Sequence, residues 1–389
     1  MLDKQSILII SVFGRVREIS NDRVNNLYDF LPFNTKKIIT TDFSHLNKAK
    51  RTGNDIRNVE YISVPEYSSN LSLKRLFSHW VFAFRLLIYL KGLKNRPDII
   101  YCVIPTPSSA LIAGTYSKLY KIKFIIDIVD IWPDGLFPIN SFFRRISFLL
   151  MPWNILNYLN YNLADKIITT HSIFTKRIER IKESNSLKHF YLGINNQIKI
   201  EAPREVKFIK EENEIWITYG GSIANIYDFD LMIGAVEFAQ KNQHRKVVFV
   251  LVGGGVLFNQ IFQKVQNSQI KNYVFTDTLN YNDFLYYLTK SDIAFNIFKE
   301  NDLIAMSYKI YDYFSVKSFV INNLKSDSAF LIDKYSVGFN VNKNTINHKL
   351  LEAVKGIDLF NSQKDRLYSD LLLELDRENI VKSIYQFIK

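Results

Sequence analysis

Short apolar runs alternate along the first half of the chain with longer segments in which apolar residues recur every three or four positions. The short runs have the length and composition of buried strands, and the longer segments have the spacing of amphipathic helices. The predicted strands are Ile7–Val12, Lys37–Thr41, Glu60–Val64, Ile99–Ile104, Phe124–Ile128 and Lys166–Thr170. The predicted helices include Asp22–Leu31, Leu73–Leu93, Ser108–Leu119 and Phe142–Asn160. Strands that alternate with helices predict a parallel sheet covered on both faces.

The same alternation resumes after a polar stretch. Residues 198–213 contain Pro203 and end in the charged run Lys210–Asn213, which predicts a linker. The strands predicted beyond it are Ile215–Tyr219, Val247–Val252, Tyr273–Thr276, Ile293–Ile297, Phe319–Asn322 and Gly338–Val341. A chain of 389 residues exceeds the usual size of a single core. The sequence therefore predicts two α/β domains facing one cleft, residues 1–197 and 214–372, followed by a helical segment over residues 373–389.

Composition is that of an ordinary globular protein, with 47% hydrophobic and 23% charged residues. The single cysteine, Cys102, lies in a predicted buried strand, so no disulfide framework is expected and a reducing cytoplasm is the expected location. The first residues show no signal-peptide pattern. Residues 71–93 and 146–164 imitate membrane spans, but charged residues interrupt the first and Pro152 with four asparagines interrupts the second. Neither is predicted to cross a membrane.

Positive charge is concentrated in the first half of the chain. Residues 1–200 contain 28 Lys and Arg against 15 Asp and Glu, a net charge of +13, whereas the remaining residues carry −1. Such a field favours an anionic partner such as a membrane lipid, a phosphate-linked acceptor or a nucleic acid, with a generic lysine-rich surface as the alternative. Lysine and arginine form no concentrated patch interleaved with aromatic residues, so nucleic acid is not an expected partner.

Glycine-rich turns follow the first two strands of the second half. The first turn is Gly220-Gly221-Ser222, and the second begins at Gly253. A glycine turn between a strand and a helix lets backbone N–H groups approach a phosphate, although an ordinary strand–helix turn has the same composition. The second turn lacks the third glycine of a dinucleotide fingerprint, and no acidic residue stands at the distance that binds a ribose. A nicotinamide cofactor is therefore not expected.

A helix is predicted to begin near Ser307. Lys309 and Asp312 are three positions apart in it, so their side chains share one face. A lysine in this place can neutralise a diphosphate, and the carboxylate can accept hydrogen bonds from ribose hydroxyl groups. A surface ion pair between the two side chains is the alternative interpretation.

Two carboxylates mark the end of a strand in the first half. Asp127 and Asp130 follow the apolar run Phe124–Ile126, at the edge where open α/β sheets bind their ligands. Pro133 restricts the backbone of Trp132 and favours an exposed turn beside Asp130. Asp130 is therefore the candidate functional residue, whereas Asp127 is expected to cap or brace the strand.

No metal centre is predicted. The six histidines show no ligand spacing, and Asp228 and Asp230 are separated by a single residue in a helical stretch. Side chains two positions apart on a helix point about 200° from one another, which prevents joint chelation. The chain also has no Gly-x-Ser-x-Gly nucleophile turn.

Taken in order, several segments resemble those of family-4-type glycosyltransferases of the GT-B fold, in particular the bacterial capsular and exopolysaccharide branch. The matching segments are Asp127-Ile-Val-Asp-Ile-Trp-Pro-Asp134, Ala164-Asp-Lys-Ile-Ile-Thr-Thr170, Leu192-Gly-Ile-Asn195, Tyr219-Gly-Gly-Ser222 with Tyr227-Asp228, Val252-Gly-Gly-Gly255, and Lys309–Ile321. The first resembles the family's Asp-x-x-Asp-x-Trp-Pro segment, and the last resembles its Lys-x-x-Glu-Tyr-x-x-x-Gly-x-Pro-Val-Ile segment. The resemblance extends over nearly the whole chain.

The resemblance implies two Rossmann-like domains, with the last helix packing back on the first. It also implies retaining transfer of a sugar from a nucleotide sugar, without a metal or other cofactor, to a polyprenyl-diphosphate-linked saccharide of a surface polysaccharide. The donor-binding residues that it implies are Gly220, Gly221, Ser222, Gly253, Thr278, Leu279, Lys309 and Asp312. The acceptor-side residues are Gly14, Asp130 and Trp132, and the catalytic residues are Asp130 and Lys309.

The chain departs from the family pattern at its acidic pair. The first Glu of that pair corresponds to Ile304 and the second to Asp312, while Glu300 and Asp302 are out of register. The family's Gly-x-Pro is replaced by Lys317-Ser-Phe319. These differences leave the contacts to the sugar open and bring in an inactive or weakened member of the family as an alternative.

Three hypotheses on function follow. The first is a transferase on the inner face of the cell membrane, held there by the basic first half and the amphipathic segment 71–93, for which a buried core helix is the alternative. The second is a nucleotide-sugar epimerase on the same scaffold. The third is a non-catalytic partner subunit of an active transferase, motivated by the missing acidic residue.

Overall fold

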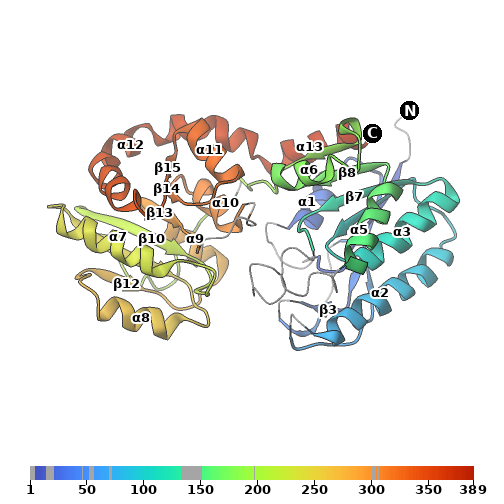
Figure 1. Cartoon of the computed structure of the whole chain (residues 1–389), viewed down its shortest axis with the longest axis horizontal. Coiled ribbons are helices and arrows are strands. Elements are labelled where there is room, and N and C mark those ends of the chain that lie inside the picture. Colours follow the sequence, from blue (N-terminus) through green and yellow to red (C-terminus); the bar gives the residue numbers. More distant parts are fainter. Residues whose placement is uncertain are drawn as a thin grey trace. The chain divides into compact units, whose positions relative to one another are not determined.

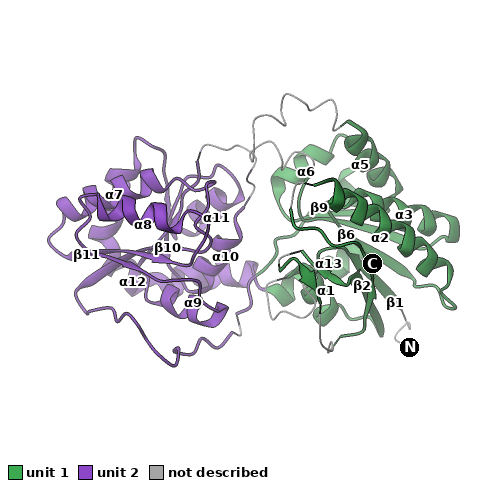
Figure 2. Ribbon diagram, turned by 90° about the horizontal axis from the view of Figure 1, so that it is seen from below, with its two compact units in different colours: residues 1–193, 377–389 green, residues 194–376 purple. Residues whose placement is uncertain are grey.

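The computed structural model describes residues 5–14, 22–45, 47–51, 57–69, 72–132, 151–196, 198–299, 304 and 306–389. The chain forms two compact units, residues 1–193 with 377–389 and residues 194–376 (Figure 2). The units divide after Gly193 and after Asp376, so the residues of the expected linker are counted with the second unit.

The first unit contains a seven-stranded sheet of order β5-β2-β1-β6-β7-β8-β9. All of its strand pairs are parallel. Every residue of the central strand β6 is buried, which explains its unbroken apolar sequence. The strands are β1 (Ser6–Ser11), β2 (Thr35–Thr41), β5 (Val59–Ile62), β6 (Ile99–Ile104), β7 (Lys123–Ile128), β8 (Lys166–Thr169) and β9 (Leu187–His189), with a short antiparallel pair β3 (Phe43–Ser44) and β4 (Ala49–Lys50) beside the sheet. The apolar pattern does not predict β3, β4 or β9, which are two or three residues long.

Helices cover this sheet. Helices α2, α3 and α5 lie side by side, with α3 against β6 and β7 (Figure 1). The bounds are α1 (Arg23–Phe30), α2 (Leu73–Lys91), α3 (Pro107–Tyr120), α5 (Met151–Leu163), α6 (Ser172–Ile178), η3 (Ser184–Ser186) and α13 (Arg377–Ile388). Residues 142–150 of the predicted helix Phe142–Asn160 lie outside the described part of the chain.

The last helix, α13, belongs to the first unit. It packs against α1, and its Tyr385 ring lies 5.5 Å from the Phe33 ring, centroid to centroid. Ile384 and Ile388 are fully buried, and Lys123 Nζ donates to the backbone oxygen of Lys389 at 2.9 Å. The expectation that the terminal helix packs back on the first unit is confirmed.

The second unit repeats the plan with a six-stranded parallel sheet of order β12-β11-β10-β13-β14-β15. Its strands are β10 (Glu214–Gly220), β11 (Lys246–Val252), β12 (Tyr273–Phe275), β13 (Ile293–Asn296), β14 (Phe319–Asn322) and β15 (Gly338–Asn340). Its helices are α7 (Phe229–Lys241), α8 (Phe258–Gln266), α9 (Tyr281–Thr289), α10 (Tyr308–Ser315), α11 (Asp327–Tyr335) and α12 (Ile346–Glu374). Both sheets therefore have the Rossmann-like strand order that reverses at the first strand.

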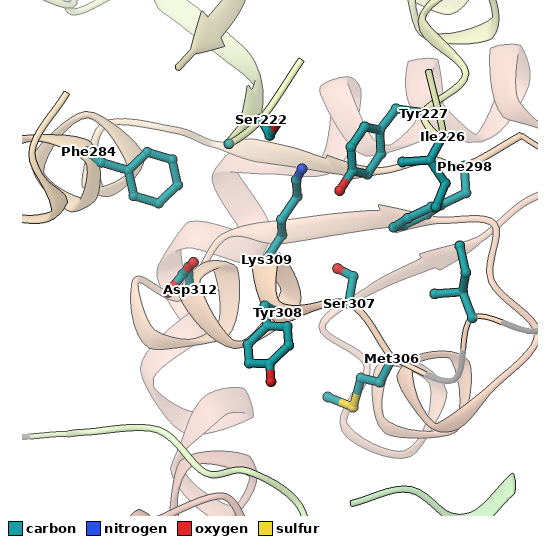
Figure 3. A pocket seen from close by; sticks show the side chains of 12 residues that line it. Ser222, Ile226, Tyr227, Phe284, Phe298, Met306, Ser307, Tyr308, Lys309 and Asp312 are labelled. Atoms are coloured by element: carbon teal, nitrogen blue, oxygen red, sulfur yellow. The ribbon is translucent and has the colours of Figure 1, made fainter. Parts of the chain in front are cut away.

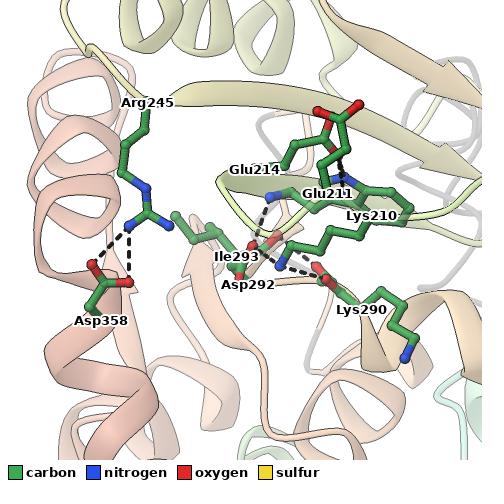
Figure 4. A network of polar contacts seen from close by, with 10 residues as sticks. Lys210, Glu211, Glu214, Arg245, Lys290, Asp292, Ile293 and Asp358 are labelled. Atoms are coloured by element: carbon green, nitrogen blue, oxygen red, sulfur yellow. Dashed lines mark hydrogen bonds and ion pairs between the residues drawn. The ribbon is translucent and has the colours of Figure 1, made fainter.

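Charged side chains fasten the amino ends of the second sheet (Figure 4). Asp292 precedes β13, and its Oδ2 accepts hydrogen bonds from Lys210 Nζ at 2.5 Å and from the Trp216 backbone N–H at 2.8 Å. Glu214 accepts from Trp216 Nε1 at 2.8 Å and pairs with Lys246 Nζ at 2.8 Å. This network, which we call the amino-edge network, ties the segment before β10 to the sheet.

Candidate functional site

A cavity lies at the carboxyl ends of the second sheet, where β10 is flanked by β11 on one side and β13 on the other. Strand order reverses at this point, and open α/β sheets bind their ligands there. The cavity has a volume of about 350 Å³, within the range of small-molecule sites. Its polar lining includes Gly221, Ser222, Ser307, Tyr308, Lys309 and Asp312 (Figure 3). Its apolar lining includes Ile226, Tyr227, Phe284, Phe298, Ile304 and Met306.

The first glycine turn forms the wall next to Lys309. Gly221 has a φ of +116°, and a Cβ placed on it would lie 2.9 Å from Lys309 Cε. Any other residue here would therefore strain the backbone and displace the lysine. The neighbouring Gly220 differs, because its N–H already donates to Tyr313 Oη at 3.0 Å. Of the two glycines, Gly221 is the one that opens space at the cavity.

The second glycine turn supports the first. A Cβ on Gly253 would lie 2.4 Å from the Gly221 backbone oxygen, and Gly253 has a φ of +131°. Its N–H donates to Thr276 Oγ1 at 3.0 Å. The close packing of two loops thus accounts for this glycine, which is not among the residues that line the cavity.

Lys309 reaches into the cavity from the first turn of α10. Only 8% of its surface is exposed. Its Nζ donates to Tyr219 Oη at 2.8 Å and lies 3.6 Å from the centroid of the Tyr227 ring. Burial lowers the pKa of Lys309 to about 7, so the amine is easily deprotonated without an anion beside it. A bound anion would favour the ammonium form.

Asp312 lies one helical turn further along α10. Tyr281 Oη, from the first residue of α9, donates to its Oδ1 at 2.8 Å. Burial raises the pKa of Asp312 to about 6. No ion pair joins Lys309 with Asp312, although both are described, so the alternative of a surface ion pair is wrong. Each side chain instead forms a hydrogen bond with a tyrosine hydroxyl, and each can form further hydrogen bonds with a ligand.

Thr278 and Leu279 lie outside the cavity lining. Thr278 is exposed and its Oγ1 lies against Gly254, whereas Leu279 packs on the apolar cluster around Trp216. Tyr219, Tyr227, Phe284 and Ser307 belong to the site, although sequence reasoning assigned them no role. Signals were present for three of them: Tyr219 and Tyr227 lie in segments that resemble the family, and Ser307 marks the predicted helix start.

In the first unit, Asp127 is a structural residue. It is fully buried, and its Oδ2 accepts from Arg23 Nε at 2.8 Å and from Tyr101 Oη at 2.7 Å. Arg23 in turn donates to the backbone oxygens of Phe190 and Tyr191. Asp127 therefore braces β7 against α1 and the end of the sheet, as expected.

Asp130 is exposed just beyond β7. Trp132 Nε1 donates to its Oδ2 at 2.9 Å, and the Arg75 guanidinium lies 4.7 Å from the centroid of the Trp132 ring. Gly14 follows β1 and is buried beside Val24. Pro133 and Asp134 lie outside the described residues, as do Glu300 and Asp302 of the second unit.

The Asp228 and Asp230 pair has structural roles. Asp228 is the N-cap of α7, where its Oδ1 accepts from the Leu231 N–H at 3.1 Å, and Asp230 pairs with Lys264 Nζ at 2.6 Å. Within the described ranges, no three His, Cys, Asp or Glu side chains gather as a metal site.

Comparison with known proteins identifies the fold. No protein-family model matches the chain, and no curated protein sequence matches it. Among solved structures, Anabaena Alr3699/HepE in complex with UDP is 11% identical over 98% of this chain and 99% of its own, with a TM-score of 0.65. A glycosyltransferase from Rickettsia africae is 14% identical over 99% of both chains, with a TM-score of 0.65. WaaG, a glycosyltransferase involved in lipopolysaccharide biosynthesis, is 11% identical over 98% of this chain and 99% of its own, with a TM-score of 0.64.

These likenesses extend over whole chains, and they agree with the two Rossmann-like units and the returning helix described above. The chain has the GT-B fold, which confirms the fold class expected from the sequence. At 11–14% identity, the comparisons establish the architecture alone.

Proposed function

We propose that the protein is a retaining glycosyltransferase that moves a sugar from a nucleotide sugar to a lipid-diphosphate-linked saccharide in the synthesis of a surface polysaccharide, without a metal. One observation carries the proposal. Gly221, Ser222, Lys309 and Asp312, which come from two distant parts of the sequence, line one cavity at the switch point of the second sheet. A lysine, a glycine turn and a helix start together suit a diphosphate.

The chemistry follows from the charges. Departure of a nucleoside diphosphate builds negative charge on its phosphate oxygens. The Lys309 amine, buried beside Tyr219 and Tyr227, gains its proton most readily when those oxygens are present. Asp312 accepts hydrogen bonds from the ribose hydroxyls. Asp130, exposed beyond β7, serves the acceptor. The HepE complex with UDP supports a nucleotide ligand for this fold.

A ligand screen tests the donor site. UDP, GDP, CDP and ADP, each with its glucose conjugate, are titrated against the wild type and Lys309→Ala by calorimetry and thermal shift. One nucleoside diphosphate should stabilise the wild type, and Lys309→Ala should weaken its binding by about 10–100-fold, because a charged hydrogen bond contributes about 1.5–3 kcal/mol.

Lys210→Ala is the matched control, because Lys210 belongs to the amino-edge network. It should leave the dissociation constant unchanged. Equal binding by wild type and Lys309→Ala, or no response of the wild type to any of the four nucleotides, would contradict the proposal.

A partner subunit that binds the donor but transfers nothing is the second candidate. Ile304 favours it, because this apolar residue lines the cavity and corresponds in sequence to the family's first acidic residue. Donor turnover by the isolated chain, measured as release of the nucleoside diphosphate, separates a transferase from such a subunit.

We further propose that helix α2 docks on an anionic membrane surface. None of the helices in the described part of the chain is long and apolar enough to cross a membrane. Helix α2 nevertheless has two apolar stripes. Phe82, Leu86 and Leu90 are buried, while the opposite stripe is at least half exposed and consists of Leu73, Phe77, Trp80, Phe84 and Ile88, with exposed fractions of 83%, 62%, 51%, 64% and 57%.

This exposed stripe has the composition of an interfacial helix. Basic residues Lys74, Arg85 and Lys91 accompany it on the same helix, and the first 200 residues carry the whole positive excess of the chain. Apolar side chains insert at the level of the headgroups while basic ones contact anionic lipid. A continuous row of exposed aromatic and aliphatic residues is unusual for a surface that faces only water.

Vesicle sedimentation tests this surface. The wild type should bind vesicles that contain phosphatidylglycerol and bind pure phosphatidylcholine weakly. A triple variant, Phe77→Ser, Trp80→Ser and Phe84→Ser, should lose at least about 100-fold in partition, because each side chain contributes about 1.5–3 kcal/mol when fully buried. The control is Leu359→Ser with Leu373→Ser on α12, where the exposed fractions are 65% and 65%.

Unchanged partition of the triple variant would overturn the membrane proposal. The proposal would also be overturned if the wild type did not bind lipid and self-associated through the exposed stripe, while the triple variant remained monomeric.

A further inference from the structure

Three asparagine side chains form a hydrogen-bonded row across the second sheet. Asn296, Asn322 and Asn340 end the neighbouring strands β13, β14 and β15 and are aligned in register. Asn296 Nδ2 donates to Asn322 Oδ1 at 2.7 Å, and Asn322 Nδ2 donates to Asn340 Oδ1 at 2.8 Å. The row ends where Asn340 Nδ2 donates to the Ala329 backbone oxygen at 3.0 Å. Asn296 and Asn322 are fully buried, with 1% and 0% exposed.

Backbone groups fix the direction of this row. The Leu324 N–H donates to Asn322 Oδ1 at 3.3 Å, and the Leu324 oxygen accepts from Asn322 Nδ2 at 2.9 Å. A backbone oxygen can only accept and an N–H can only donate, so Asn322 and Asn340 each have one allowed amide orientation. A flipped Asn296 would place its oxygen against Asn322 Oδ1. The row therefore points every amide oxygen toward the cavity side.

At its other end, the row meets Ser307, which lines the cavity. Ser307 Oγ donates to Asn296 Oδ1 at 2.8 Å, so its single proton is committed. Ser307 is also the N-cap of α10, yet its side chain makes no capping hydrogen bond. No described group donates to Ser307 Oγ. A hydroxyl has one proton and two lone pairs, so Ser307 offers the cavity acceptor capacity alone.

We infer that Ser307 Oγ accepts a hydrogen bond from a hydroxyl group of the transferred sugar, and that the asparagine row fixes it in this role. The inference rests on the proposed function. An ionised diphosphate has no proton to donate, so Ser307 cannot bond it, whereas a sugar hydroxyl can donate. The cavity wall near Ser307 also includes Phe298 and Met306, which offer a sugar hydroxyl no strong side-chain hydrogen bond (Figure 3).

Comparing diphosphates with their glucose conjugates distinguishes a contact between Ser307 and the sugar from a contact between Ser307 and the diphosphate. The nucleoside diphosphates UDP, GDP, CDP and ADP are each compared with their glucose conjugates on wild type, Ser307→Ala and Ser307→Thr. Ser307→Ala should bind the bare diphosphate within about twofold of wild type and its glucose conjugate about 3–10-fold more weakly. Ser307→Thr keeps the hydroxyl and should recover most of the loss. Ser222→Ala is the matched control and should affect both ligands equally.

Fluorinated sugar analogues test the direction of the hydrogen bond between the sugar hydroxyl and Ser307. Fluorine cannot donate, so one monodeoxyfluoro-glucose conjugate should lose about 3–10-fold on wild type and nothing further on Ser307→Ala. Asn296→Ala releases the Ser307 proton and should shrink that loss, with binding of the bare diphosphate as the check on folding.

Two results would overturn the inference. One is an equal weakening of bare diphosphate and conjugate by Ser307→Ala, which would make Ser307 a phosphate contact. The other is an unchanged penalty for every fluorinated analogue in Ser307→Ala. If the wild type binds none of the four diphosphates, the proposed function fails, and this inference fails with it.

Discussion

The two edges of the second sheet use charge in opposite ways. At the amino ends, Lys210, Asp292, Glu214 and Lys246 find partners within the protein. Burial alone would raise the pKa of Glu214, but hydrogen bonds from Lys246 and Trp216 lower it overall. At the carboxyl ends, burial lowers the pKa of Lys309 to about 7 and raises that of Asp312 to about 6.

The difference distinguishes charged side chains that stabilise the fold from those that are available to a ligand. In the amino-edge network, the neighbours of Glu214 and Lys246 favour the charged form of each. Together with the ion pair between Lys210 and Asp292, these side chains hold the sheet and the segment before it together. Lys309 and Asp312 are in the reverse position, because the surroundings disfavour the charged form of each. Ionisable side chains whose charged form is disfavoured lower the stability of the fold, and they are typical of functional sites. A ligand that supplies the missing partner would remove the cost.

The largest effect that this comparison predicts is on stability, and its absence would contradict the comparison. Asp292→Ala removes the acceptor of the Trp216 N–H and of Lys210, and should lower the free energy of unfolding by about 2–4 kcal/mol. Asp312→Ala should lower it little, since the charged carboxylate is disfavoured in the fold. Urea unfolding followed by circular dichroism measures both.

Ligand binding should show the reverse order. Asp292→Ala should bind the nucleoside diphosphate as tightly as wild type, and Asp312→Ala should bind it about tenfold more weakly, a loss of about 1.4 kcal/mol. Equal effects of the two substitutions on stability and on binding would show that the two edges do not differ in this way.

Much of the fold could be predicted from local pattern. Buried parallel strands such as Ile99–Ile104 and Val247–Val252 are unbroken apolar runs, and their alternation with helices leaves few topologies. The terminal helix could be placed only through the family resemblance, because its contacts with α1 join residues far apart in sequence. Short strands such as β9 carry too few residues for a periodic signal.

The site could be predicted where spacing within one element was enough. Lys309 and Asp312 share a face of α10 because they are three residues apart, and Gly221 follows a buried strand directly. Thr278 and Leu279 came from the resemblance alone and lie outside the cavity lining. The asparagine row depends on register between three strands, which no local pattern sets. Its one signal is an asparagine closing each of the strands β13, β14 and β15.

The smallest expected effect is on the pH dependence of binding, and it sharpens the comparison. The proposed site needs Lys309 protonated and Asp312 ionised, so affinity for the glucose conjugate should be greatest between about pH 6 and 7. Above pH 7 the free lysine loses its proton, and since the diphosphate raises its pKa, binding should take up a proton and weaken by up to about tenfold per pH unit. Below pH 6 protonation of Asp312 should weaken binding likewise. Calorimetry in buffers of different ionisation enthalpy measures both limbs, and Lys309→Arg, which stays charged, should abolish the alkaline one. An alkaline limb that persists in Lys309→Arg would assign it to another group.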